Sequence, residues 1–194
     1  MKIAIDLDDT LSKVDRAKGV EKYLSERKLS FPLRDRNAHV LQDMYDWTRA
    51  EVDEFIRAGG VTVFTDAPPR AFARETLQEW KKAGHEIIIL TARIPEWFGD
   101  PVEVSRAWLN KHGIQYDEIV ANIWEKGEYC VEHKIDILIE DNFEISQKAQ
   151  SLGVKAVLFV DTHNEAHAEG IKYRGRDWQE VASAVDAIVR TKAE

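Results

Sequence analysis

The chain has 194 residues, 44% of them apolar and 32% charged, a balance that suits one globular domain with room for a small insertion. A formal net charge of −8 argues against a general nucleic-acid-binding surface and against an anionic membrane as a partner. The single cysteine excludes an internal disulfide, and no segment reads as a signal peptide or as a membrane span of roughly 18 apolar residues, so we expect a cytoplasmic protein.

Short apolar runs alternate with helical patterns along most of the chain. The predicted strands are 2–7, 86–90, 118–121, 135–139 and 155–160. The predicted helices are 69–83, 101–112, 127–133, 143–152 and 178–189. The strands are almost continuously apolar, as expected where helices cover both faces of a sheet. The alternation therefore predicts an α/β fold with a Rossmann-like parallel sheet sandwiched by helices.

Residues 12–66 interrupt this alternation. Their patterns predict two helices and a late strand, at 14–26, 37–57 and 61–64. Phe31-Pro32 lies in the joint between the two helices, where proline disfavours a continuous helix. We therefore expect a small helical cap at 12–66, inserted after the first strand of a core formed by 1–11 and 67–194.

The first predicted strand runs directly into acidic residues, in the order Asp6-Leu7-Asp8-Asp9-Thr10. Ligands of parallel-sheet proteins lie beyond the carboxyl ends of the strands, and Asp6 and Asp8 share a side while the chain stays extended. Two carboxylates this close repel each other unless a proton or a cation separates them, and Mg²⁺ prefers such oxygen ligands. Taken alone, the same residues also suit an acidic turn after a strand.

Two further predicted strands end in polar residues. The strand at 86–90 leads into Thr91-Ala92-Arg93, and the strand at 135–139 leads into Glu140-Asp141. Each of these could be a helix cap by itself. Three such strand ends at one edge of a sheet favour a shared active site.

These motifs resemble those of the haloacid dehalogenase (HAD) superfamily. An apolar strand followed by Asp6-x-Asp8-x-Thr10 matches the first motif, Thr91 matches the second, and Glu140-Asp141 matches the fourth, with a lysine of the third motif before it. The order and spacing fit the whole chain. The stretches 64–68, 84–93 and 126–142 look most like the small cytosolic 5′-nucleotidase (deoxyribonucleotidase-like) group.

The resemblance implies a Mg²⁺-dependent phosphatase with an aspartyl-phosphate intermediate. Asp6 would be the nucleophile, and Asp8 would be the general acid and then the general base. The ion would be held by the Asp6 carboxylate, the main-chain oxygen of Asp8 and the carboxylate of Asp141, with Glu140 acting through a metal-bound water.

The resemblance also implies a binding site for the substrate phosphate, formed by Thr10, Thr91, Ala92 and a lysine. Two lysines are candidates for the third motif. Lys126 begins a predicted helix after the third strand, at the carboxyl edge, whereas Lys134 precedes a strand at the opposite edge. The rule that ligands lie at the carboxyl edge favours Lys126.

The polar stretch 162–175 is predicted to be a long loop, and it holds His163, Glu165 and His167. Their spacing does not match the helical His-Glu-x-x-His pattern of zinc peptidases, so a solvated loop is favoured over a metal site. Cys130 falls on the apolar pattern of its helix, which favours a small buried side chain over a nucleophile.

Several aromatic residues have two interpretations. Trp47, Trp97 and Phe98 suit a core by their spacing, but near the mouth of a site they could stack on a nucleobase. Arg93 could bind phosphate or pair with a neighbouring acid.

The preferred function is a nucleotidase for nucleoside monophosphates, and the alternative is a HAD-type phosphatase for a sugar phosphate or another small metabolite. The expected partner is a small-molecule phosphate ester, with neither a nucleic acid polymer nor a membrane; formation of a homo-oligomer is left open. A receiver-type signalling domain is disfavoured because the strand at 118–121 ends in Asn122 rather than in a phospho-acceptor aspartate. A non-catalytic binding module is disfavoured because every motif position holds a chemically competent residue.

Overall fold

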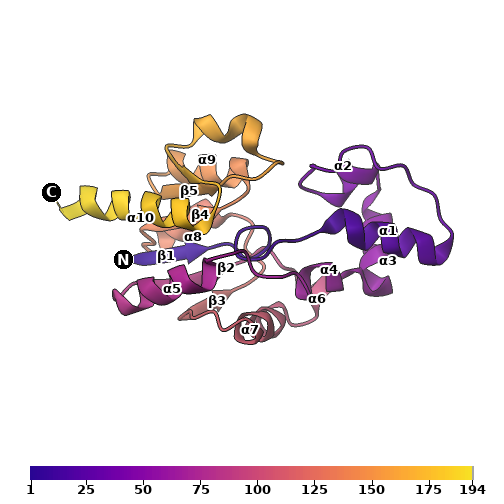
Figure 1. The fold of residues 1–194 in the computed structure, drawn as a ribbon, viewed down its shortest axis with the longest axis horizontal. Coiled ribbons are helices and arrows are strands. Elements are labelled where there is room, and N and C mark those ends of the chain that lie inside the picture. Colours follow the sequence, from indigo (N-terminus) through magenta and orange to yellow (C-terminus); the bar gives the residue numbers. More distant parts are fainter. Residues whose placement is uncertain (194) are drawn as a thin grey trace.

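The computed structural model describes residues 1–193 and contains a six-stranded sheet with helices on both faces (Figure 1). The strands are β1 (Lys2–Ile5), β2 (Glu86–Leu90), β3 (Glu118–Val120), β4 (Ile137–Glu140), β5 (Lys155–Phe159) and β6 (Tyr173–Gly175). Their order is β3-β2-β1-β4-β5-β6, and each pairs in parallel with its neighbours. The predicted α/β fold class is confirmed.

Alternate residues of each strand face opposite layers of helices, because side chains alternate across a strand. Ile3 and Ile5 of β1 are fully buried in a cluster with α5 (Ala73–Lys82), α7 (Pro101–Lys111) and α10 (Trp178–Ala193). Ala4, between them, is buried in a second cluster with α8 (Lys126–Glu132) and α9 (Phe143–Ser151). Burial on both faces explains why these strands are continuously apolar.

The stretch 162–175 is more ordered than predicted. It contains a 3-10 helix, Glu165–Gly170, and the edge strand β6, in which Tyr173 pairs with Val157 of β5. The prediction of a long loop was therefore wrong for most of this stretch. Three residues of mixed polarity at a sheet edge give no periodicity from which a strand could be predicted.

A group of helices follows β1 and lies to one side of the sheet (Figure 1). They are α1 (Arg16–Arg27), α2 (Leu41–Tyr45), α3 (Arg49–Phe55), the π-helix Ile56–Gly60 and α4 (Thr62–Thr65). They bury an aromatic-rich cluster of their own, which includes Tyr23, Trp47 and Phe55. The division into a core and a cap at residues 12–66 stays a prediction. No helix within residues 1–193 is long and apolar enough to cross a bilayer.

The helix predicted at 37–57 is broken in two. Asp46 adopts the left-handed conformation, with φ of 57°, and ends α2 after only five residues. Thr48 then starts α3 with a capping box, in which its hydroxyl and the carboxylate of Glu51 cap each other's backbone N–H groups. The signal for this break was present in the sequence, since Thr48 and Glu51 have the spacing of that motif.

The strand predicted at 61–64 is wrong, because these residues form α4. Val61 has helical torsions, and the Thr62 hydroxyl donates to the Gly59 carbonyl at 2.9 Å. The β-branched residues favour a strand by propensity, but no sheet edge lies beside them to pair with. A helical turn instead buries Phe64 against Phe98 of α6 (Pro95–Phe98).

Candidate active site

The three central strands bring the predicted acidic and hydroxyl residues together. Asp6 follows β1, Thr91 follows β2, Glu140 is the last residue of β4, and Asp141 follows it. The backbone holds them in register: the N–H of Asp6 donates to the Ile139 carbonyl at 2.9 Å. Because β2, β1 and β4 are adjacent and parallel, all four side chains lie at one edge of the sheet.

Lys126 is the cation of this group. Its Nζ lies 2.5 Å from Oδ1 of Asp6 and 2.6 Å from Oε2 of Glu140, and the side chain is 2% exposed. Lys126 is the first residue of α8, which packs closely on α9 at Gly127: a Cβ there would meet the Ala149 backbone at 3.2 Å. Lys134 is exposed, so the structure places Lys126 rather than Lys134 beside the acids.

Burial and mutual interactions shift the pKa values of Asp6, Glu140 and Lys126. Burial, together with the nearby carboxylates of Glu140 and Asp141, raises the pKa of Asp6 well above its ordinary value, although Lys126 opposes the shift. Burial also raises the pKa of Glu140 to about 7 against the same opposition. Burial alone would lower the pKa of Lys126, but the two carboxylates raise it, so this lysine is cationic near pH 7. The three carboxyl groups of Asp6, Glu140 and Asp141 therefore surround a single lysine cation, Lys126.

Asp8 is held by Arg93. The guanidinium donates from Nε and Nη2 to the two carboxylate oxygens of Asp8, both at 2.8 Å, in a bidentate pair. Arg93 is 3% exposed and lies over the Phe98 ring. Of the two interpretations of Arg93, the structure therefore shows pairing with an acid, and this acid is the predicted proton donor rather than a surface residue.

Thr10 occupies a different position from the one expected. Its hydroxyl is fully buried and donates to Oδ1 of Asp141 at 3.0 Å, and it does not line the cavity over the acids. This geometry suits orientation of Asp141 rather than direct contact with a substrate phosphate. Thr91 and Ala92 do line the cavity, and the Thr91 hydroxyl accepts from the Arg93 N–H at 3.3 Å.

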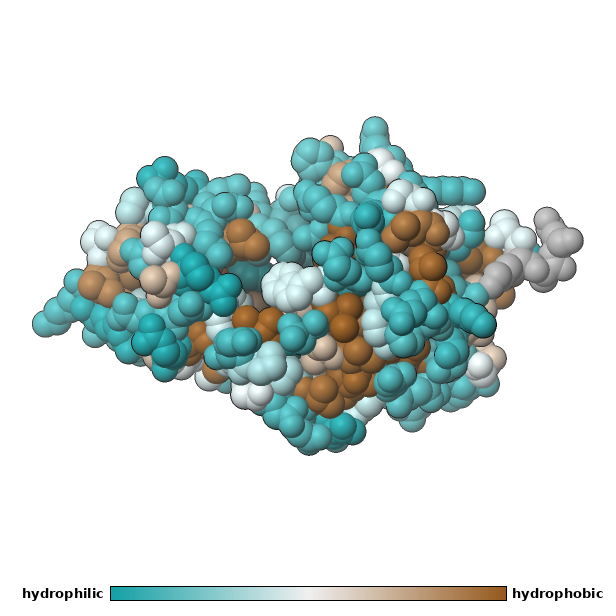
Figure 2. All heavy atoms as spheres, turned by 180° about the vertical axis from the view of Figure 1, so that it is seen from behind, coloured by the Kyte–Doolittle hydropathy of each residue, from teal (hydrophilic) through white to brown (hydrophobic). Residues whose placement is uncertain are grey.

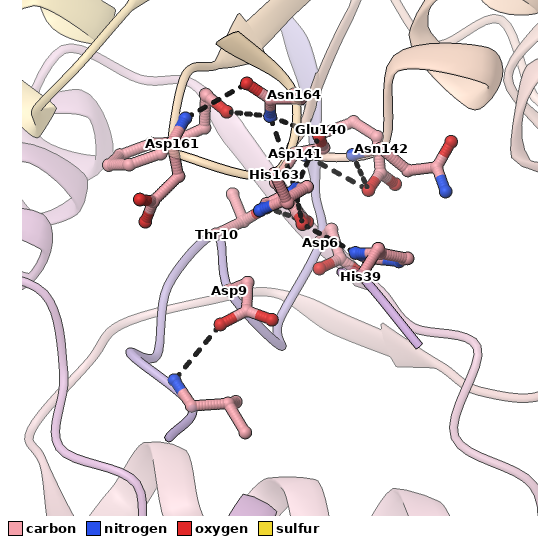
Figure 3. A network of polar contacts seen from close by, with 12 residues as sticks. Asp6, Asp9, Thr10, His39, Glu140, Asp141, Asn142, Asp161, His163 and Asn164 are labelled. Carbon is pink, nitrogen blue, oxygen red and sulfur yellow. Dashed lines mark hydrogen bonds and ion pairs between the residues drawn. The ribbon is translucent and has the colours of Figure 1, made fainter. Parts of the chain in front are cut away.

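Two histidines that were not predicted as site residues lie beside Asp141 (Figure 3). Nε2 of His163 lies 3.0 Å from Oδ2 of Asp141, and Nδ1 of His39 lies 3.6 Å from the same oxygen. Burial would raise the pKa of Asp141, but His163 and His39 outweigh it and hold that pKa below its usual range. No pattern in the sequence indicated His39, which lies in the inserted segment and meets Asp141 only through the tertiary fold.

The side chains of His163, Glu165 and His167, which share a motif in the sequence, do not come together in the structure. Glu165 pairs with Arg176 on the surface, and His167 packs on the Phe143 ring. The prediction of a solvated loop did not anticipate the contact of His163 with Asp141. Cys130 is fully buried as predicted, and burial raises the pKa of its thiol to about 12.

A cavity of about 230 Å³ lies over the acids, between the inserted helices and the sheet. The molecular surface is hollowed between these two parts (Figure 2). Asp6, Asp8 and Lys126 form part of its floor. Its walls include aromatic side chains from both parts, namely Phe64, Trp97, Phe98 and Trp124. Trp47 does not line it and belongs to the helical core.

The acidic residues fit a divalent cation. Asp6, Glu140 and Asp141 each offer a carboxylate oxygen, and these oxygens lie within 4.8 Å of one another. Hard cations such as Mg²⁺ take carboxylate oxygens. Burial and the neighbouring carboxylates raise the pKa of Asp6, and a bound cation would oppose both effects.

No protein-family profile and no curated protein sequence matches the chain. Solved structures do match its fold. A predicted phosphoglycolate phosphatase from Haemophilus somnus 129pt has a TM-score of 0.68 at 16% identity, over 95% of this chain and 96% of that one. A predicted phosphatase from Clostridium acetobutylicum has a TM-score of 0.65 at 16% identity, over 96% and 98%. A HAD-superfamily hydrolase of subfamily IA from Geobacter sulfurreducens has a TM-score of 0.59 at 11% identity, over 96% and 95%. At these identities the likeness establishes a shared HAD-like fold.

Proposed function

We propose that this chain is a phosphomonoester hydrolase in which Asp6 is the nucleophile. The observation that carries the proposal is the contact of buried Asp6 with Lys126 at the carboxyl edge of the sheet, under a cavity open to a small molecule. The cation lowers the electrostatic barrier to the approach of an anionic ester towards an anionic nucleophile. The phosphatases and hydrolases that share this fold support the same reaction class.

In the first step an Asp6 oxygen attacks phosphorus, and the bond from phosphorus to the leaving oxygen breaks as that oxygen takes a proton from Asp8. In the second step water attacks the aspartyl-phosphate, Asp8 accepts a proton, and phosphate and free Asp6 are released. Asp8 would have to leave its bidentate pair with Arg93 to reach the leaving oxygen, because the guanidinium engages both of its carboxylate oxygens. Lys126 and Thr91 would hold the other phosphoryl oxygens.

The cation that we propose here is Mg²⁺. Asp6 and Asp141 would hold it through their carboxylates, with the main-chain oxygen of Asp8, and Glu140 would act through water because Lys126 and two backbone N–H groups already engage its carboxylate. When bound, Mg²⁺ would neutralise charge on the phosphoryl group and orient it. The donor set of carboxylate oxygens supports this choice of ion.

For the substrate we propose a nucleoside monophosphate. The aromatic walls of the cavity support this, because every nucleobase has a face that can stack on an aromatic ring. A small-metabolite phosphate is the second candidate, and the similarity to a predicted phosphoglycolate phosphatase favours it.

Phosphate release from a panel of nucleoside monophosphates and sugar phosphates, with Mg²⁺ or with EDTA, tests the proposal. We expect turnover with Mg²⁺ that Asp6→Asn reduces by at least about 10³-fold, as for loss of a covalent nucleophile. Asp43→Asn, the same chemical change at an exposed site, should leave turnover unchanged. Full activity of Asp6→Asn, or no turnover of any ester by the folded protein, would overturn the proposal.

A further inference from the structure

A second ligand cluster adjoins the acidic group. It comprises His39, Asp141 and His163, each of which offers one ligand atom within 4.8 Å of the other two (Figure 3). Ion pairs join Oδ2 of Asp141 to Nε2 of His163 and to Nδ1 of His39. The oxygen is 3.0 Å from the His163 nitrogen and 3.6 Å from the His39 nitrogen. Ligands bound to one ion at about 2.0–2.2 Å are separated by roughly 3.0–3.6 Å from one another.

Two of the three atoms lack a hydrogen bond of good geometry, although Oδ2 of Asp141 forms an ion pair with His163 at 3.0 Å. Oδ2 of Asp141 and Nδ1 of His39 are buried atoms without a hydrogen-bond partner among residues 1–193. Buried polar atoms are normally satisfied, and each exception requires an explanation. A simple ion pair of His163 with Asp141 would still leave the His39 nitrogen unsatisfied, although it faces the same oxygen.

The surrounding structure fixes these side chains from two directions. Asn164 is buried and donates from Nδ2 to the main-chain carbonyls of Asp141 and Phe159, at 2.6 and 2.9 Å, which keeps the loop of His163 against the end of β4. His39 comes from the inserted segment, two residues before α2, and its ring lies 5.0 Å from the His163 ring. The cluster therefore joins the inserted segment to the sheet.

We propose that His39, Asp141 and His163 form a binding site for a first-row transition-metal ion, distinct in chemistry from the Mg²⁺ site. Two imidazole nitrogens with one carboxylate suit Zn²⁺, Co²⁺ or Fe²⁺, whereas Mg²⁺ prefers oxygen ligands. Because Asp141 belongs to both clusters, an ion at the histidines would draw on the carboxylate proposed to serve the catalytic ion. An ion bound there would also hold the inserted segment, through His39, against Asp141 at the end of β4.

Isothermal titration with Zn²⁺, run with and without millimolar Mg²⁺ because both sites use Asp141, tests the proposal without any measurement of turnover. We expect one Zn²⁺ per chain, with affinity at least about tenfold weaker in His39→Ala and in His163→Ala. His167→Ala is the matched control, since it removes a nearby histidine of the 3-10 helix that packs on Phe143 and is not part of the cluster. Co²⁺ titration with visible absorption provides a second measurement, in which the bands of the bound ion should disappear with His39→Ala.

Absence of Zn²⁺ binding to the folded protein, or equal binding by all variants, would overturn the proposal and leave the cluster as an ion pair. The circular dichroism spectrum of each variant checks its folding. His39 is 35% exposed, so its substitution leaves a usable test even where that of His163 disturbs the fold. Binding of Zn²⁺ is independent of hydrolysis, so it can succeed or fail whether or not the chain is a phosphatase.

Discussion

The sheet and the inserted helices are held together in different ways. The sheet buries strand residues on both faces, and its polar side chains meet at one edge, where they contact one another directly. The inserted helices bury aromatic rings around Trp47 and Phe55, with few buried polar groups. The two regions meet over the cavity. The charged groups therefore lie at the sheet edge, whereas the inserted helices supply part of the cavity wall, including Phe64 and Val52.

The largest effect is expected from Lys126→Met, at the sheet edge. Removal of the cation leaves the buried carboxylates of Asp6 and Glu140 without their positively charged partner, which costs roughly 3–5 kcal/mol of the free energy of unfolding. Turnover should fall by about 10²–10³-fold, because a charge that stabilises the phosphoryl group is lost. Denaturant unfolding and phosphate release measure the two effects. Lys134→Met, at an exposed site, is the matched control and should change neither; equal behaviour of the two variants would contradict the assigned role.

A pair of phenylalanine substitutions tests whether the inserted helices form a unit separate from the sheet. Phe55 and Phe159 are both 1% exposed, one in each region. Phe→Ala at either site should cost about 3–5 kcal/mol locally. We expect Phe55→Ala to add an early transition in calorimetry while the main one persists, and Phe159→Ala to lower the main one. A single transition shifted equally by both variants would instead show that residues 12–66 and the rest of the chain unfold as one unit.

The same contrast decided what could be predicted from the sequence. Strands β1, β2 and β4 were predicted to within a residue or two because burial on both faces leaves a continuous apolar run, and their ends located Asp6, Thr91 and Asp141. In the inserted segment, packing overrode propensity, as at 61–64, and a single left-handed residue, Asp46, divided a predicted helix.

The contacts of site residues were less predictable than their positions. Asp6 and Lys126 could be located from strand ends, but the pairing of Asp8 with Arg93 and the approach of His39 depend on side chains that the tertiary fold brings together. Neither leaves a periodic or motif-like signal. Thr10 matched its motif, yet its hydroxyl points to Asp141 rather than to the cavity.

A smaller effect is expected from pH in the metal-free protein. The pKa of Glu140 is about 7 in the folded state against 4.5 for the free group, and that of Asp6 is also raised, so the folded state binds these protons more tightly than the unfolded state. The free energy of unfolding should therefore fall as pH rises from about 4.5 to 7. Denaturant unfolding in EDTA at several pH values measures this slope. Glu140→Gln should flatten it, and Mg²⁺ should oppose it; an unchanged slope in Glu140→Gln would contradict this origin.

The smallest effect on stability, and the most selective one on substrate, is expected from Trp124→Ala. Trp124 lines the cavity but is 60% exposed, so the free energy of unfolding should change by less than about 0.5 kcal/mol. If its ring stacks on a base, KM for a nucleoside monophosphate should rise about five- to tenfold, equivalent to roughly 1 kcal/mol of stacking, while KM for a sugar phosphate stays constant. Phe72→Ala, exposed and remote from the cavity, is the control. Equal changes in KM for both ester classes would remove the aromatic argument for a nucleotide and favour the small-metabolite phosphate, because the wall of the cavity would then not distinguish a base from any other leaving group.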